Sequence, residues 1–350
     1  MSVQSIARTV RVAAAVALVV SGSLLVSAQE PSRGQGGGFS FRTAVDLVTL
    51  NATVTDTSGH AVAGLRAEDF IVYEDGERQT VSQFEAERVP VSLGLTVDTS
   101  GSMAGEKMSA AQDAVSRFVL DLLGPRDQVF LYRFDSHPML LQDWTDDKRA
   151  IVRSISSVRP SGGTALYDAV AEAVPLAGTG TRRKKALVVI SDGNDTDSEI
   201  SVNELRQLIR ESEVMVYAIG IDGSGAGPSS GQTIPIPWPG SGGTIQLPWP
   251  RRPPPPPPPT SRRAPGHSGQ NGVNVEALRM ITDDSGGRTE IIYSARDLDP
   301  ATAGIASELS QQYFVGYVST RPKDGRWHKI DIRVRNGSYL VRARKGYVAN

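Results

Sequence analysis

The chain has 350 residues and a formal net charge of −1, with 37 Lys and Arg against 38 Asp and Glu. This length allows two domains and a linker, and so balanced a charge gives no bulk attraction to nucleic acid. The sequence contains no cysteine, which excludes thiol catalysis, disulfides and cysteine-bound zinc or iron–sulfur sites. The four histidines, at positions 60, 137, 267 and 328, lack metal-ligand spacing, so we expect surface or packing roles for them.

Residues 1–28 have the features of a secretory signal peptide. Arg8 and Arg11 give a basic start, an apolar run follows over Val12–Val26, and small residues suited to a cleavage site end the segment. The apolar run is short and interrupted for a membrane span, and no cysteine is available for a lipid anchor. We expect a secreted or periplasmic protein with no stable membrane span after cleavage. The alternative is an uncleaved N-terminal anchor.

The next part of the chain has a β-type pattern. Residues 29–43 are rich in Gly and Ser, and we expect a flexible segment there. Alternating apolar and polar residues then predict strands within residues 44–88, at Ala44–Asp56, Phe70–Glu74 and Arg78–Phe84, with Asp75-Gly76 as a hairpin turn. Three strands make a marginal core by themselves.

Residues 89–312 alternate between strand and helix patterns, which predicts an α/β domain with a doubly wound, mostly parallel sheet. The first apolar strand begins near Val91 and ends at Asp98. Further strands are expected at 128–134, 139–144, 185–191, 214–221 and 289–293, and helices around 108–122 and at 148–158, 166–176, 203–212, 275–282 and 297–312. A basic cluster at 182–185 is expected to be solvated at a strand entry.

The loop after the first α/β strand is rich in hydroxyl groups. Asp98, Ser100 and Ser102 stand at i, i+2 and i+4, with Gly101 between the serines. In a tight turn this spacing can direct three oxygens toward one point. Oxygen donors that carry one full negative charge suit a hard divalent cation, above all Mg²⁺. Three donors do not fill an octahedron, so other parts of the chain must supply the rest.

Two later segments can complete such a site. Thr164 follows a Ser-Gly-Gly loop just before a helix, and Asp192 ends a second buried strand. Because the carboxyl ends of parallel strands border one crevice, Asp98 and Asp192 are expected to lie close together. As alternatives, these side chains could be helix caps or turn residues. An aspartic protease is a poor match, because the extra serine interrupts its motif and no second motif supplies the partner carboxylate.

The remaining segments are a linker-like insert and a second β region. Residues 223–272 are rich in Pro and Gly and include the run Pro253–Pro259, so they are expected to bury no core and to contain a stiff polyproline II rod. Residues 313–350 alternate again, with strands expected at 313–320, 327–335 and 339–344. We predict that this region and residues 44–88 form one small β-sandwich, with the α/β domain inserted between its two halves.

The five candidate metal ligands make the chain resemble the von Willebrand factor type A (VWA) family. The metal-ion-dependent adhesion site (MIDAS) of that family has the pattern Asp-x-Ser-x-Ser, then a Thr, then an Asp after a later strand, and Asp98, Ser100, Ser102, Thr164 and Asp192 match it in order. The resemblance implies a Rossmann-like domain that binds Mg²⁺, with Mn²⁺ as the alternative and Ca²⁺ as a weaker fit. It also implies a protein partner whose Asp or Glu carboxylate completes the metal shell. The flanks are similar to those of bacterial secreted VWA-related proteins.

These expectations lead to one main hypothesis on function and two alternatives. The main one is a secreted or envelope adhesion or protein-binding module, and not an enzyme. The second is a metal-dependent hydrolase of phosphatase type, which needs a nucleophile or general base beside the ion, with Asp135 and Asp195 as candidates. The third is a structural or assembly protein of the cell envelope in which the metal site has lost its role.

Overall fold

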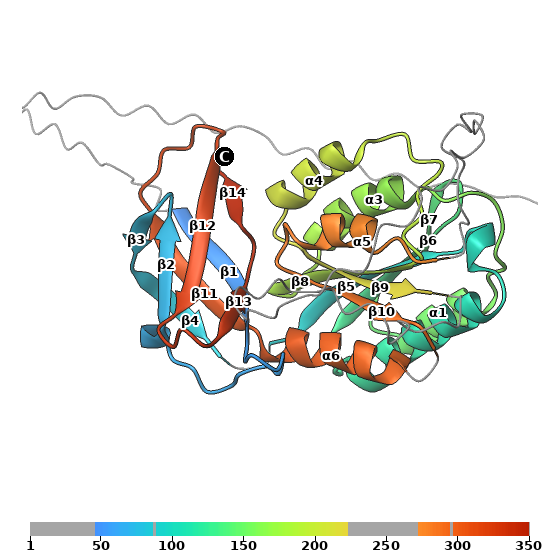
Figure 1. The fold of residues 1–350 in the computed structure, drawn as a ribbon, viewed down its shortest axis with the longest axis horizontal. Helices are drawn as coiled ribbons and strands as arrows, with labels where there is room; N and C mark the ends of the chain where they lie inside the picture. Colours follow the sequence, from blue (N-terminus) through green and yellow to red (C-terminus); the bar gives the residue numbers. More distant parts are fainter. Residues whose placement is uncertain (1–45, 87–88, 223–271, 295–296, 350) are drawn as a thin grey trace, which may run out of the picture. The chain divides into compact units, whose positions relative to one another are not determined.

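The computed structural model describes residues 46–86, 89–222, 272–294 and 297–349. The expected signal peptide at 1–28, the segment 29–43 and almost all of the proline-rich insert lie outside the described residues. The described chain forms one six-stranded sheet and two four-stranded sheets (Figure 1). Within these ranges, no helix combines the length and apolar character needed to cross a membrane.

The six-stranded sheet has the order β10-β9-β8-β5-β6-β7. Its strands are β5 (Val91–Asp98), β6 (Gln128–Phe134), β7 (Pro138–Thr145), β8 (Lys184–Ser191), β9 (Met215–Ile221) and β10 (Thr289–Ile292). All neighbouring strands run parallel except the edge pair β6 and β7. The chain enters at β5, proceeds outward to β7 and returns on the other side at β8. The point where the order reverses therefore lies between β5 and β8, where open α/β sheets place their ligand crevice.

Six helices among the described residues cover the sheet on both faces (Figure 1). They are α1 (Glu106–Arg117), α2 (Lys148–Ser156), α3 (Leu166–Gly178), α4 (Val202–Glu211), α5 (Val275–Thr282) and α6 (Leu298–Gln311). One apolar core joins α1, α2 and α6 to the sheet, and a second joins α3, α4 and α5. Because both faces are covered, strands such as β5 and β9 are buried along their full length. The predicted fold class, doubly wound α/β with added β-sheets, is confirmed.

The two four-stranded sheets have the orders β13-β1-β11-β4 and β14-β12-β2-β3, with antiparallel pairing. Their strands are β1 (Asp46–Thr55), β2 (Phe70–Glu74), β3 (Glu77–Gln79), β4 (Val81–Glu85), β11 (Tyr313–Ser319), β12 (Trp327–Val334), β13 (Leu340–Arg342) and β14 (Gly346–Val348). Each sheet combines strands from before and after the α/β region. One apolar core with residues from both sheets, including Leu50, Val72, Val315 and Ile332, holds them together.

The structure corrects two strand predictions in this β-sandwich. The strand expected at Arg78–Phe84 is two strands, because the chain leaves one sheet at Gln79 and enters the other at Val81. The short strand β14 was not predicted at all. It pairs with the start of β12, and a Cβ on Gly346 would lie 2.4 Å from the Trp327 ring. Position 346 must be glycine because the indole ring of Trp327 packs against it. This requirement comes from tertiary packing, so the alternation of apolar and polar residues in the sequence does not reveal it.

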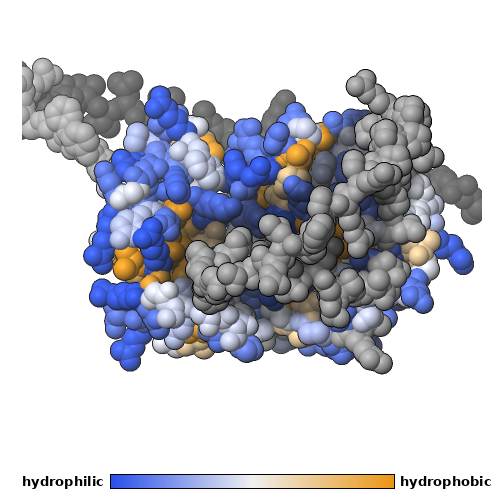
Figure 2. Space-filling model, viewed as in Figure 1, coloured by the Kyte–Doolittle hydropathy of each residue, from blue (hydrophilic) through white to orange (hydrophobic). Residues whose placement is uncertain are grey.

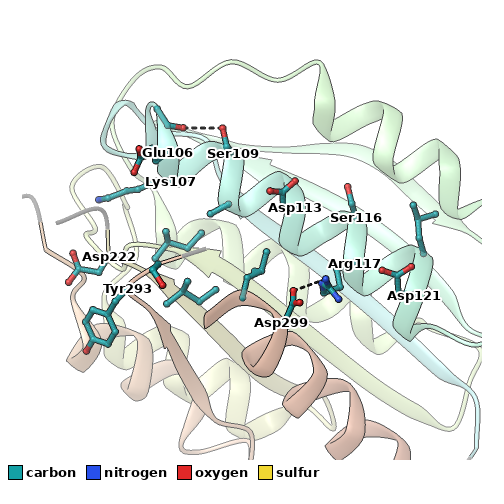
Figure 3. A pocket seen from close by; sticks show the side chains of 17 residues that line it. Glu106, Lys107, Ser109, Asp113, Ser116, Arg117, Asp121, Asp222, Tyr293 and Asp299 are labelled. Carbon is teal, nitrogen blue, oxygen red and sulfur yellow. Dashed lines mark hydrogen bonds and ion pairs between the residues drawn. The ribbon is translucent and has the colours of Figure 1, made fainter. Parts of the chain in front are cut away.

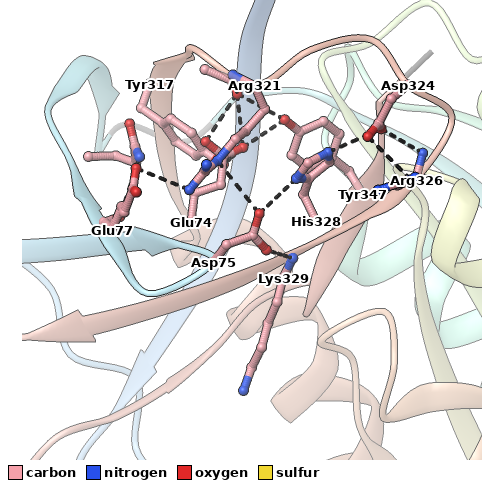
Figure 4. Close-up of polar contacts among 12 residues, drawn as sticks. Glu74, Asp75, Glu77, Tyr317, Arg321, Asp324, Arg326, His328, Lys329 and Tyr347 are labelled. Atoms are coloured by element: carbon pink, nitrogen blue, oxygen red, sulfur yellow. Dashed lines mark hydrogen bonds and ion pairs between the residues drawn. The ribbon is translucent and has the colours of Figure 1, made fainter.

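A polar network lies inside the β-sandwich (Figure 4). Glu74 is fully buried at the end of β2. Its carboxylate accepts hydrogen bonds from the hydroxyls of Tyr347 at 2.7 Å, Ser319 at 2.9 Å and Tyr317 at 3.2 Å. These donors come from β11 and β14, more than 240 positions away in the chain. The network therefore links the N-terminal and C-terminal parts of the sandwich.

Candidate metal centre

Asp98 is the last residue of β5, and its side chain is fully buried. The backbone N–H of Ser100 donates to Asp98 Oδ1 at 2.9 Å, and the hydroxyl of Ser191, the last residue of β8, donates to Oδ2 at 2.6 Å. The pKa of Asp98 is raised to about 6. Burial is the main cause and the charge of Asp192 adds to it, while the hydrogen bonds from Ser100 and Ser191 act in the opposite direction. The two carboxylates thus lie within electrostatic reach of each other at neighbouring strand ends.

The two serines of the motif follow Asp98 in a short loop. Ser100 Oγ lies 3.0 Å from Ser102 Oγ. Ser100 is buried whereas Ser102 is exposed, so the pair of hydroxyls leads from the strand end to the solvent. The loop is bound to the segment that carries Thr164, because Gly101 N donates to the carbonyl of Gly162 at 3.0 Å.

Thr164 is buried just before α3. Its N–H donates to Thr196 Oγ1 at 3.0 Å, and its carbonyl accepts from the backbone N–H groups of Thr196 and Asp197. A Cβ on Gly163 would lie 2.1 Å from Asp197 Oδ2, and Gly162 has a φ of +75°. The two glycines are therefore required for the path of the chain into Thr164.

Asp192 directly follows β8, and its side chain is fully buried. Asn194 donates to Asp192 Oδ1 through both its backbone and its side-chain nitrogen, at 3.2 and 3.1 Å. The ammonium group of Lys107, near the start of α1, donates to Oδ2 at 2.8 Å. Sequence analysis did not identify Lys107, because an isolated lysine at the start of an amphipathic helix is usually solvated.

Three loops thus carry all five predicted ligands, and these loops hydrogen-bond to one another. The β5 loop is bonded to the Thr164 segment, that segment to the loop after β8, and Ser191 of β8 back to Asp98. Among the described residues, no group of three or more His, Cys, Asp or Glu side chains could hold a metal ion. A cation here would therefore need hydroxyl ligands beside two carboxylates, an all-oxygen donor set that fits a hard ion.

The two aspartates considered for hydrolysis have structural partners. Asp195 Oδ1 accepts from Leu166 N at the start of α3 at 2.8 Å and from Ser198 Oγ at 2.5 Å. Asp135 forms a half-buried ion pair with Arg133 at 2.6 Å. Neither aspartate is therefore a simply solvated turn residue. Their bonds hold the loops around the candidate centre in place.

A cavity of about 890 Å³ lies beside the candidate centre, between α1 and α6 (Figure 3). Neither Asp98 nor Asp192 lines it. Acidic side chains of α1 border it, and Arg117 of α1 is paired with Asp299 of α6 at 2.6 Å. Lys107 lies at the end of the cavity nearest the strand ends and connects its wall to Asp192.

Comparison with known protein families agrees with the resemblance seen in the sequence. The family model described as von Willebrand factor type A domain matches residues 94–194, a range that includes all five predicted ligands. The chain carries a VWA domain. Its match begins within β5 and ends just after β8, so it covers the two strands whose ends approach each other.

Relatives of this VWA domain are distant. Human inter-alpha-trypsin inhibitor heavy chain H4 is 25% identical over 149 residues, which are 39% of this chain and 16% of that protein. The minor fimbrium subunit Mfa5 of Porphyromonas gingivalis is 28% identical over 122 residues, 32% of this chain and 10% of the subunit. The chain therefore spans only a small part of the length of these relatives. The solved von Willebrand factor type A structure from Catenulispora acidiphila is 12% identical, with a TM-score of 0.45 and coverage of 88% of this chain and 75% of that one.

Proposed function

We propose that this protein is a secreted or envelope adhesion module whose MIDAS-type centre binds Mg²⁺ and then a carboxylate of a protein partner. One observation supports this most strongly. Asp98 is buried and held by Ser191 from the neighbouring strand, directly beside a pair of serine hydroxyls that reaches the solvent. VWA domains are typically protein-interaction modules, which agrees with this arrangement.

The donor set explains why the partner would be acidic. Asp98 and Asp192 would contribute the negative charge, and Ser100, Ser102 and Thr164 would contribute neutral oxygens. A bound Mg²⁺ supplies a strong electrophile that usually retains open coordination positions. With so few charged ligands, the centre favours an anionic oxygen from outside. Mn²⁺ would serve similarly, whereas Ca²⁺ prefers a larger shell of about six to eight oxygens.

The contacts of Asp135 and Asp195 weigh against a hydrolase. A general base must reach the attacking water, but Asp195 is already bound at the start of α3 and Asp135 is bound to Arg133.

The surface also suits a polar capture site better than a broad apolar one. Figure 2 shows a largely hydrophilic face with small, separate hydrophobic patches where the described side chains are visible.

The test is metal-dependent capture. Wild-type protein, Asp98→Ala and the control Asp331→Ala are immobilised and exposed to cell-surface extracts in Mg²⁺ or in EDTA. Asp331 is a suitable control because it lies in the sandwich, paired with Arg333. We expect a protein partner that binds the wild type and the control in Mg²⁺ only, and that loses binding when its own acidic contact residue is neutralised. Phosphate-ester turnover that disappears in Asp98→Ala would contradict the proposal and support the hydrolase.

A further inference from the structure

We infer that Lys107 is a charge-setting part of the metal centre, which weakens metal binding and strengthens the binding of an anion to the loaded centre. This inference rests on the proposed function, and it assigns a role to a residue outside the five predicted ligands. It starts from the position of Lys107. Lys107 is the second residue of α1, and the helix begins directly after Gly105, which has a φ of +77°.

The pair that Lys107 forms is buried on both sides. Lys107 is 7% exposed and Asp192 is fully buried, with 2.8 Å between Nζ and Oδ2. Lysine is almost never buried unless it is paired. A buried ion pair often stabilises a fold no more than packed apolar side chains do, because both charges must be desolvated. The presence of the Lys107–Asp192 pair at this position therefore favours a role for Lys107 beyond stabilising the fold.

A second buried lysine in the same domain shows what a structural lysine looks like. Lys184 stands at the opposite end of β8 from Asp192 and is 1% exposed. Its ammonium donates to the carbonyl oxygens of Leu309 and Gln312, at 3.1 and 3.2 Å, and so binds the end of α6. Its position also corrects, for Lys184 alone, the expectation that the basic cluster at 182–185 is solvated, since Arg183 is exposed and Arg182 and Lys185 are partly exposed. Lys107 differs because its acceptor is the carboxylate of a predicted metal ligand.

The sum of charges at the centre shows the effect of placing the Lys107 ammonium beside a predicted metal ligand. Asp98 and Asp192 carry two negative charges, and Lys107 reduces the sum to one. A divalent cation then makes the centre net positive, and a partner carboxylate makes it neutral. Without Lys107, the loaded centre would be neutral, and the partner carboxylate would make it negative. The ammonium thus repels the metal ion and attracts the anion, both over short distances in a buried setting where charge interactions are strong.

The test is Lys107→Met, which removes the charge and retains much of the side-chain length. Mn²⁺ affinity is measured by calorimetry, and acetate serves as the carboxylate probe, detected by Mn²⁺-dependent broadening of its methyl proton signal. We expect Mn²⁺ to bind about tenfold more tightly and acetate about tenfold more weakly than in the wild type. Lys107→Arg, which retains the charge, should remain within about threefold of the wild type in both measurements.

Lys184→Met is the matched control, because it removes a buried lysine charge at the far end of the same strand. It should change neither Mn²⁺ nor acetate binding. If Lys107→Met does not fold, Lys107→Gln removes the charge with a polar side chain and is measured in its place. If the neutral variant binds Mn²⁺ and acetate each with the same affinity as the wild type, the role of Lys107 is overturned. Wild-type protein that takes up no Mn²⁺ would instead overturn the proposed function.

Discussion

Glu74 in the β-sandwich and Asp98 in the α/β region are both fully buried carboxylates, but their surroundings differ. Three hydroxyl groups of the protein donate to Glu74. Asp98 receives hydrogen bonds from Ser100 and Ser191, yet it also lies within electrostatic reach of a second buried carboxylate, Asp192. The first arrangement is complete without a ligand. The second sets two like charges at one strand edge, and Lys107 compensates only one of them. A divalent cation would remove the remaining repulsion.

The comparison indicates which carboxylate serves stability and which serves binding. Functional sites commonly retain groups that lower stability, while structural networks satisfy every polar atom. The following predictions separate the two roles, beginning with the largest expected effect.

Glu74→Ala should destabilise the protein by about 3 kcal/mol, because it leaves a cavity and removes the acceptor of buried hydroxyls. The affected donors are Tyr317, Ser319 and Tyr347. Denaturant unfolding measures the change in the free energy of unfolding. Glu77→Ala, an exposed neighbour, should stay within about 0.5 kcal/mol of the wild type. The comparison would fail if Glu74→Ala lost Mn²⁺ binding while its stability remained unchanged.

Thr164→Ala should weaken acetate binding to the Mn²⁺-loaded protein by about tenfold and change Mn²⁺ affinity much less. The VWA resemblance implies that this threonine engages the ion when an acidic partner arrives. Its backbone contacts to Thr196 and Asp197 should persist in the variant, since they use main-chain atoms of residue 164. Calorimetry for Mn²⁺ and line broadening for acetate provide the two affinities. Equal losses in both would assign Thr164 to metal binding alone.

His328→Gln should have the smallest effect, and that effect should depend on pH. His328 Nδ1 lies 2.8 Å from Asp75 Oδ2, with Asp324 on the other side of the ring and Tyr347 packed beside it (Figure 4). The hydrogen bond to Asp75 raises the pKa of His328 above its ordinary value of 6.5, although burial opposes this. The charged form therefore stabilises the fold fully below about pH 6.5, and this contribution is lost as the pH rises through the raised pKa.

Unfolding free energies at about pH 5.5 and about pH 8.5 test this dependence. The difference between wild type and His328→Gln should be larger at the lower pH. His60→Gln is the matched control, because His60 is 82% exposed beside Asp56. A loss from His328→Gln that is identical at both pH values would show that the ring contributes only by packing.

The fold could be predicted from the sequence because most of its signals are local. The apolar strand before Asp98 and the hairpin turn at Asp75-Gly76 each depend on neighbouring residues. The break between Gln79 and Val81 could not be predicted in this way. It arises because the short hairpin ends there and the chain crosses to the opposite sheet, which is a property of tertiary packing.

The candidate centre also combines features that local sequence predicts with features that depend on tertiary packing. Asp98, Ser100 and Ser102 follow from spacing in one loop, and Asp192 from its place at a strand end. Lys107 could not be predicted, because its contact with Asp192 spans 85 positions and depends on how α1 packs beside β8. The donors to Glu74 are likewise distant in sequence. Metal binding by the five predicted ligands is a prediction, and solution measurement tests it.

Calorimetric titration of Mg²⁺ and Mn²⁺ into wild type and Asp98→Ala tests the central claim most directly, with unfolding in EDTA measured alongside. The wild type should bind a single ion, and Asp98→Ala should bind none. The variant should lose less stability than Glu74→Ala does, because removing Asp98 also removes its repulsion with Asp192. Wild-type protein that binds neither ion, or Asp98→Ala protein that binds with wild-type affinity, would contradict the account.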